Sequence, residues 1–177
     1  MTKLKYLKKT ELSMILLVAV AWSLLAYASA FYFPQVYGLV LLPTSFFAAI
    51  VFLVVKKIGS VALLFSITGI MTLPVPFLGV LGPDKILIFV STGIIFELVA
   101  HANKNILNAA VAGTVSNAAV PWLILWLGKT QLPAGLENAV LNFTFVSSIL
   151  GLTGSLAGLF VWYKIKNSKT ILKSEYG

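Results

Sequence analysis

One glutamate and the only histidine of the chain come closest, by type and spacing, to a chemical site. Glu97 lies inside an apolar run, and His101 follows four residues later, on the same face if the segment is helical. A carboxylate and an imidazole so placed could relay a proton or pair with each other, but they supply only two of the three protein ligands of a typical catalytic zinc site. They could equally form the polar end of a helix, so their meaning depends on where a membrane lies.

The composition indicates that lipid is the solvent for most of this chain. Of its 177 residues, 59% are hydrophobic and only 10% are charged, whereas a soluble domain usually carries about 25% charged residues. A single small core cannot bury such an apolar excess. We therefore predict one integral membrane domain that covers residues 1–177.

Several chemistries are excluded by what the chain lacks. It has no cysteine, which excludes disulfides, thiol catalysis and thiolate metal sites. It contains no HExxH, paired-aspartate, GxSxG or phosphate-loop motif, and five acidic residues leave little for a metal site. We expect no enzyme activity, no metal and no cofactor, and any ATP-driven work would need a separate subunit.

Six apolar segments predict an all-α integral membrane protein, a bundle of six transmembrane helices. The predicted spans are at about residues 12–33, 38–55, 58–76, 83–102, 106–127 and 138–163. Most approach the roughly 20 residues that cross a hydrocarbon core. The apolar cores of the third and fourth are short, so five spans with a re-entrant segment remain an alternative. Pro83, as a first-turn proline, would lengthen the fourth helix.

The lysines set the orientation. The net charge of +8 comes from thirteen lysines and no arginine, and their positions indicate topology rather than nucleic-acid binding. With the N-terminus in the cytoplasm, eleven lysines face inside and only Lys85 and Lys129 face outside, as the positive-inside rule requires. We therefore predict cytoplasmic N- and C-termini, a lipid bilayer as partner and no nucleic acid.

Three loops would then face outside, at residues 32–38, 73–85 and 128–138. They are longer than the inner turns, and all contain proline and glycine. The contrast suggests a binding site on the outer face. The alternative is that these residues only end helices.

Aromatic and amide side chains in the outer halves of the last two spans are candidate ligand contacts. Trp122 and Trp126 lie four residues apart on one face, and an aromatic wall with a few amides suits a flat, partly polar organic ligand. The alternatives are an interfacial aromatic belt and hydrogen bonds between helices. The predicted substrate-binding residues are Tyr37, Asn117, Trp122, Trp126, Asn138 and Asn142.

Small residues at four-residue spacing mark faces where helices can approach closely. Gly154 and Gly158 form a GxxxG pair in the sixth span. In the first span, Ala19 and Ser23 share one stripe, and Ala26 and Ala30 share another. Both patterns are compatible with packing inside the bundle or with docking of a partner subunit.

The segment "KKIGSVALLFSITGI…PDKILIFVSTGIIFELV" is similar to the third and fourth helices of the substrate-binding S-components of energy-coupling factor (ECF) transporters. In that family a glycine and an acidic residue recur late in helix four, here Gly93 and Glu97, and "NKNILNAAVAGTVSN" resembles the start of the fifth helix. The resemblance implies a prokaryotic plasma-membrane protein that binds a vitamin-like nutrient in an outward-facing pocket. No residue pattern identifies the vitamin.

The resemblance also implies partners, namely a transmembrane coupling subunit connected to two cytoplasmic ATPases. The small-residue stripe of the first helix usually docks on the coupling subunit. Here the candidates are Ala19, Ser23, Ala26 and Ala30. They depart from the family's AxxxA repeat because Ala19 is followed by Ser23 and the other two fall on a different stripe.

Two other functions are compatible with the sequence. One is a self-sufficient small proton-coupled transporter or channel that acts as an oligomer with Glu97 as its proton site, which inverted repeats would support, although none is visible. The other is an intramembrane lipid-processing enzyme, for which catalytic groups are sparse. The predicted topology puts Glu97 in the cytoplasmic half of its helix and His101 at the inner boundary. It therefore favours a structural or coupling role over proton relay or contact with an outer ligand.

Overall fold

Helices make up almost all of the part of the chain that the computed structural model describes, which is residues 7–32, 40–78, 80, 82–102, 106–127 and 137–166. Within these ranges there are six: α1 (Lys9–Tyr32), α2 (Leu41–Val55), α3 (Ser60–Met71), α4 (Pro83–Ala102), α5 (Asn108–Leu127) and α6 (Glu137–Lys166). The only other regular pairing in the described residues is an isolated antiparallel bridge between Phe77 and Val80. The predicted all-α fold is confirmed.

Four of these helices, α1, α4, α5 and α6, are long and apolar enough to cross a membrane. The outer surface of the bundle is also apolar, with Leu17 71% and Trp126 79% exposed among many other large hydrophobic side chains. A soluble protein rarely leaves so much apolar surface in water. Both findings indicate an α-helical membrane protein.

The two remaining helices are shorter. With 15 and 12 residues, α2 and α3 extend about 22 Å and 18 Å, less than the roughly 30 Å of a hydrocarbon core. The third span was predicted at 58–76, but α3 ends at Met71. The reason is local: Pro74 and Pro76 cannot donate backbone hydrogen bonds, so the chain leaves the helix before them.

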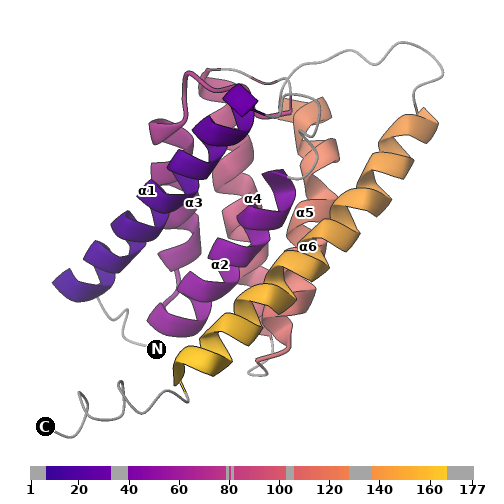
Figure 1. The fold of residues 1–177 in the computed structure, drawn as a ribbon. Helices are drawn as coiled ribbons and strands as arrows, with labels where there is room; N and C mark the ends of the chain where they lie inside the picture. Colours follow the sequence, from indigo (N-terminus) through magenta and orange to yellow (C-terminus); the bar gives the residue numbers. More distant parts are fainter. Residues whose placement is uncertain are drawn as a thin grey trace, which may run out of the picture.

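Helix α2 is the central element of the bundle, because it contacts each of the other five described helices. Around it, α1 packs on α3, α3 on α4, α4 on α5, and α5 on α6 (Figure 1). The α6 helix is the longest and packs on α2, which also contacts α1, so α2 joins the two ends of this row.

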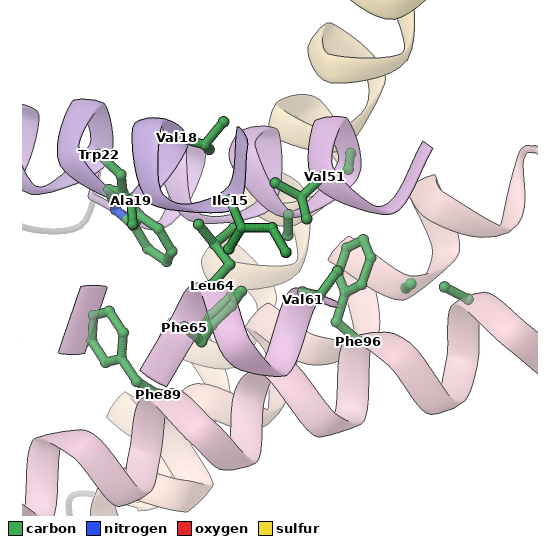
Figure 2. Packing of buried hydrophobic residues seen from close by; sticks show 14 of the residues in the cluster. Ile15, Val18, Ala19, Trp22, Val51, Val61, Leu64, Phe65, Phe89 and Phe96 are labelled. Carbon is green, nitrogen blue, oxygen red and sulfur yellow. The ribbon is translucent and has the colours of Figure 1, made fainter. Parts of the chain in front are cut away.

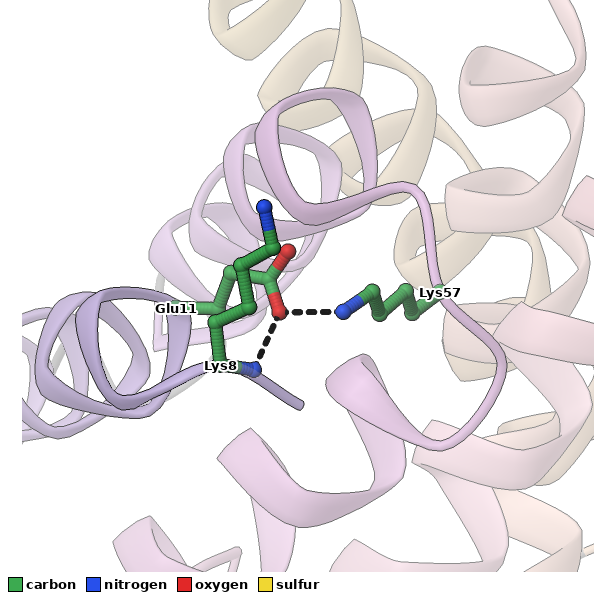
Figure 3. A network of polar contacts seen from close by, with 3 residues as sticks. All are labelled: Lys8, Glu11 and Lys57. Atoms are coloured by element: carbon green, nitrogen blue, oxygen red, sulfur yellow. Dashed lines mark hydrogen bonds and ion pairs between the residues drawn. The ribbon is translucent and has the colours of Figure 1, made fainter. Parts of the chain in front are cut away.

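One end of the bundle, which we call the lysine end, gathers the start of α1, the α2–α3 turn and the end of α6. Glu11 in the first turn of α1 accepts hydrogen bonds from the Lys8 backbone N–H at 2.7 Å and from Lys57 Nζ at 2.5 Å (Figure 3). Lys56 Nζ lies 6.0 Å from the centre of the Trp162 ring near the end of α6. We call the opposite end, where α4 begins, the loop end.

The core between α1, α3 and α4 is aromatic. Trp22 is buried and makes an edge contact with Phe65 at 5.0 Å and a stacked contact with Phe89 at 5.6 Å between ring centres (Figure 2). Such pairs stabilise packing beyond the area they bury. They fix α1 against the α3–α4 pair.

Glycines let α6 approach its two neighbours. A Cβ on Gly113 of α5 would lie 2.8 Å from the Gly151 carbonyl oxygen of α6, and a Cβ on Gly158 would lie 2.8 Å from the Phe46 carbonyl oxygen of α2. A Cβ on Gly154 would likewise collide with the Leu42 carbonyl oxygen of α2. The GxxxG pair therefore packs inside the bundle.

We expect Gly113→Ala to destabilise the protein, because the new methyl group would collide with the α6 backbone, which cannot yield like a side chain. Overpacking of this kind costs about 1–3 kcal/mol. Gly69→Ala is the matched control, because its Cβ would make an ordinary contact 3.4 Å from Phe89 Cβ. Thermal unfolding in detergent should show a lower Tm for Gly113→Ala and an unchanged or higher Tm for Gly69→Ala; equal effects would contradict the packing analysis.

Candidate functional site

Glu97 of α4 closes the lysine end of α3. Its side chain is only 7% exposed, and its two carboxylate oxygens accept hydrogen bonds from the backbone N–H groups of Gly59, at 2.8 Å, and Val61, at 2.6 Å. The first N–H groups of a helix have no partner within the helix, and they carry the positive end of its dipole. Glu97 therefore caps α3 from a neighbouring helix.

His101 does not pair with the Glu97 side chain. Its Nδ1 lies 3.0 Å from the Glu97 main-chain carbonyl oxygen, one turn earlier in α4. Since a carbonyl only accepts, Nδ1 is the protonated nitrogen of this ring. The imidazole is exposed and makes an edge contact with Phe52 of α2. The placement of both residues agrees with a structural role at the lysine end.

Lys85 of α4 closes the other end of α3. It is 1% exposed, and its Nζ donates hydrogen bonds to the carbonyl oxygens of Thr72 and, at 2.7 Å, Val75. Thr72 is the C-terminal cap of α3, where carbonyls without helical partners carry the negative end of the dipole. A buried ammonium is costly unless it is paired, and these carbonyls supply the pairing.

Beyond Thr72 the chain folds back over the loop end as a tight turn. The N–H of Phe77 donates to the carbonyl of Val80, and the N–H of Val80 donates to the carbonyl of Phe77, both at 2.9 Å. Leu78 has a φ of +49°, which side-chain-bearing residues seldom adopt outside turns. Lys85 holds the base of this turn through Val75, so α4 positions both α3 and the turn.

A small cavity lies under this turn, and we call it the loop-end cavity. Its apolar walls are the rings of Trp22, Phe77 and Phe89, from α1, the turn and α4. Its volume of about 20 Å³ is enough for one water molecule. It also borders Ser29 and Val40, which flank the first predicted outer loop.

The polar atoms of the cavity are hydroxyls. Thr72 Oγ1 donates to the Thr68 carbonyl at 2.7 Å, and Ser29 Oγ donates to the Ala26 carbonyl at 2.9 Å. Thr68 Oγ1 is buried and has no hydrogen-bond partner within the described part of the chain. A buried hydroxyl without a partner is unfavourable, so this atom calls for a water molecule or a ligand atom in the cavity.

The two predicted ligand-binding tryptophans of α5 lie elsewhere. Trp122 and Trp126 continue the exposed stripe of Val111 and Val115, at helical spacing. This stripe faces away from the bundle, which favours the interfacial-belt alternative. Their role in ligand binding stays a prediction, and so does that of Tyr37, which lies outside the described residues.

The predicted amides divide into one buried and two exposed residues. Asn117 is fully buried and donates from Nδ2 to the Leu41 carbonyl of α2 at 2.8 Å. The sequence had left such a hydrogen bond between helices open as an alternative to ligand binding. The other amide atom, Asn117 Oδ1, has no partner among the described residues. Asn138 and Asn142 are exposed in the first turns of α6. The structure does not bring the three amides together.

The predicted docking stripes of α1 have different environments. Ala19 and Ser23 are buried in the aromatic core, where Ser23 Oγ donates to the Ala19 carbonyl. Ala26 and Ala30 are half-buried, and Ala26 borders the loop-end cavity. In this arrangement only the second pair is accessible to a partner, and its docking role stays a prediction.

Sequence reasoning missed the residues that line the loop-end cavity. Trp22 carried one usable signal, because it lies near the middle of α1, where an interfacial aromatic belt does not reach. Ala26 and Ser29 follow it four and seven residues later, on the same helical face. Thr68 and Phe89 had no such signal, since both sit within apolar runs.

No known family, curated protein or solved structure matches this chain. The likeness to S-components therefore rests on the sequence segments quoted above.

Removing the Lys85 ammonium should loosen the roof of the cavity. Lys85→Met removes the donor to the Val75 carbonyl and leaves the Thr72 carbonyl with the Val75 N–H alone, and a buried unsatisfied group costs about 1–3 kcal/mol. Lys164→Met is the control, because that side chain is exposed at the lysine end. Hydrogen exchange by mass spectrometry should show faster exchange in peptides covering residues 72–78 for Lys85→Met only. Unchanged exchange would contradict the role of Lys85 as the anchor of the turn.

Proposed function

We propose that this chain is the membrane-embedded substrate-capture subunit of an ECF-type importer, and that its nutrient ligand binds at the loop-end cavity. The observation that carries the proposal is the buried Thr68 hydroxyl, which has no partner among the described residues, in a cavity walled by Trp22, Phe77 and Phe89. Ligand sites are mostly apolar and aromatic, with a few polar groups that fix orientation. The cavity has this composition.

The membrane topology in this proposal has six spans with both termini in the cytoplasm. Its support is that the start of α1 and the end of α6 share the lysine end, through the contacts of Glu11 with Lys57 and of Lys56 with Trp162. An excess of lysine at one end favours the cytoplasmic side for that end. The loop end then faces outside, where a nutrient arrives.

The chemistry of the cavity favours a flat organic ligand of the vitamin class. Aromatic rings stack on planar rings, and hydroxyls can donate to or accept from a heteroatom. The ammonium of Lys85, which anchors the turn over the cavity, is already engaged with two carbonyls. At about 20 Å³ the cavity is closed around roughly one water, so ligand entry displaces the Phe77–Val80 turn.

Transport in this proposal needs partners, because the sequence contains no nucleotide-binding motif. A transmembrane coupling subunit and cytoplasmic ATPases would supply the energy. The alternative of a self-sufficient proton-coupled transporter draws less support, since both Glu97 oxygens accept helix N–H groups. A carboxylate engaged in this way is suited to capping rather than to cycling a proton.

The direct test is ligand retention. Purified protein should hold one small molecule per chain in native mass spectrometry after incubation with B-vitamins, their precursors and related nutrients. Absence of any binder, or substrate flux in liposomes that contain this protein alone, would contradict a capture subunit.

Variants locate the site once a ligand is found. Thr68→Val keeps the shape and removes one hydrogen bond worth about 0.5–1.5 kcal/mol, so affinity should fall by up to about tenfold. Thr153→Val, at an exposed position on α6, should leave the Kd unchanged in isothermal titration calorimetry. Trp22→Phe should weaken binding and Trp126→Phe should not. The reverse order of the two tryptophan variants would move the site to α5.

A further inference from the structure

A lateral groove lies at the lysine end between α3 and α4, well away from the loop-end cavity. It has a volume of about 470 Å³, within the range of about 300–1,000 Å³ that is usual for small-molecule sites. Its walls are the largely exposed side chains of Ile58, Ile94 and Leu98. It therefore opens sideways, toward the hydrocarbon that surrounds the bundle.

Small residues on α3 create the space. Gly59 and Ala62 line the groove, and a Cβ built on Gly59 would meet no atom within 4 Å. Along α4 the groove runs from Ile94 to Ala102, which is about 12 Å at the helical rise. An apolar groove of this length can hold a segment of a single hydrocarbon chain along α4.

The end of the groove carries a polar rim. His101 lines it, and because Nδ1 is engaged with the Glu97 carbonyl, Nε2 is the ring nitrogen that can contact a ligand. Glu97 also borders the groove, but its two oxygens already accept the Gly59 and Val61 N–H groups. Among these groups, the imidazole is the one suited to a phosphate oxygen, because its doubly protonated form carries an Nε2–H that can donate to that oxygen while Nδ1–H donates to the Glu97 carbonyl.

The charge at the lysine end, where the groove lies, favours an anionic ligand. In the described residues the lysine end carries two glutamates, Glu11 and Glu97, both engaged in hydrogen bonds. It also carries a larger number of lysines: Lys8, Lys9, Lys56, Lys57, Lys164 and Lys166. Such an excess attracts anionic headgroups of the membrane surface.

We propose that this groove binds an anionic phospholipid, with one acyl chain between α3 and α4 and the phosphate at His101. The acyl chain covers apolar side chains beside the Glu97 cap of α3, and the lipid headgroup lies at the level where the lysines concentrate. This site is independent of the proposed nutrient site, because it shares no residue with the loop-end cavity.

The test compares two lipids in native mass spectrometry of the purified, delipidated protein. Phosphatidylglycerol should be retained at one molecule per chain, and phosphatidylcholine should be retained at least fivefold less. Ala62→Phe fills the groove and should lower phosphatidylglycerol retention about tenfold. Leu17→Phe, at an exposed position on α1, is the matched control and should retain the lipid. His101→Gln should reduce the preference for phosphatidylglycerol.

Two outcomes would overturn the proposal. One is equal retention of the two lipids, or equal retention by Ala62→Phe and Leu17→Phe, which is expected of unspecific annular lipid. The other is a dimer that dissociates in Ala62→Phe, because a second copy would then fill the groove. If Ala62→Phe fails to fold, Ile94→Trp closes the groove from the α4 side, where the native side chain is 44% exposed.

Discussion

Two opposite charges on one helix close both ends of its neighbour, and the rest of the structure depends on this arrangement. Glu97 and Lys85 are twelve residues apart on α4, about 18 Å along its axis, and α3 between them has twelve residues. The carboxylate meets the positive end of the α3 dipole and the ammonium meets the negative end. Charged groups are expensive in an apolar bundle unless they are paired, and backbone groups at helix ends are expensive for the same reason. Here each charged side chain pairs with the backbone groups at one end of α3, so both the charge and the backbone groups are satisfied.

This arrangement also places the two candidate sites at opposite ends of the same helix pair. Because Lys85 fixes Thr72 and Val75, the chain after α3 turns over the aromatic core and roofs the loop-end cavity. Because Glu97 fixes Gly59, the α2–α3 turn stays close to α4 while the small side chains beside it leave the lateral groove open. Close approach at Gly93, where a Cβ would lie 3.0 Å from Ala62 Cα, keeps the two helices in register between these ends.

The sequence predicts helices well here and predicts orientation of side chains poorly. The all-α class and the bounds of α4 follow from the apolar runs and from Pro83. The early end of α3 could not be predicted, because Leu73 and Val75 continue the apolar pattern beyond it. The caps could not be foreseen, since the partners of Glu97 and Lys85 are backbone atoms, which have no sequence signature. The sequence also does not distinguish Trp22, which is buried, from Trp126, which is exposed. In a membrane both the core-facing and the lipid-facing sides are apolar, so periodicity does not separate them.

The close packing of the bundle across α2, α5 and α6 supports the proposed capture role more than the alternative of conduction. Across α2, α5 and α6, the buried polar side chains among the described residues donate to backbone carbonyls, as Asn117 does to Leu41 and Ser155 does to Ser45. The glycine contacts at Gly113 and Gly158 bring those helices together without space between them. A path through such an interior would require separating packed backbones, whereas the described residues of the Phe77–Val80 turn are joined by two backbone hydrogen bonds. The loop end is therefore the place where the proposed capture subunit would open to its ligand.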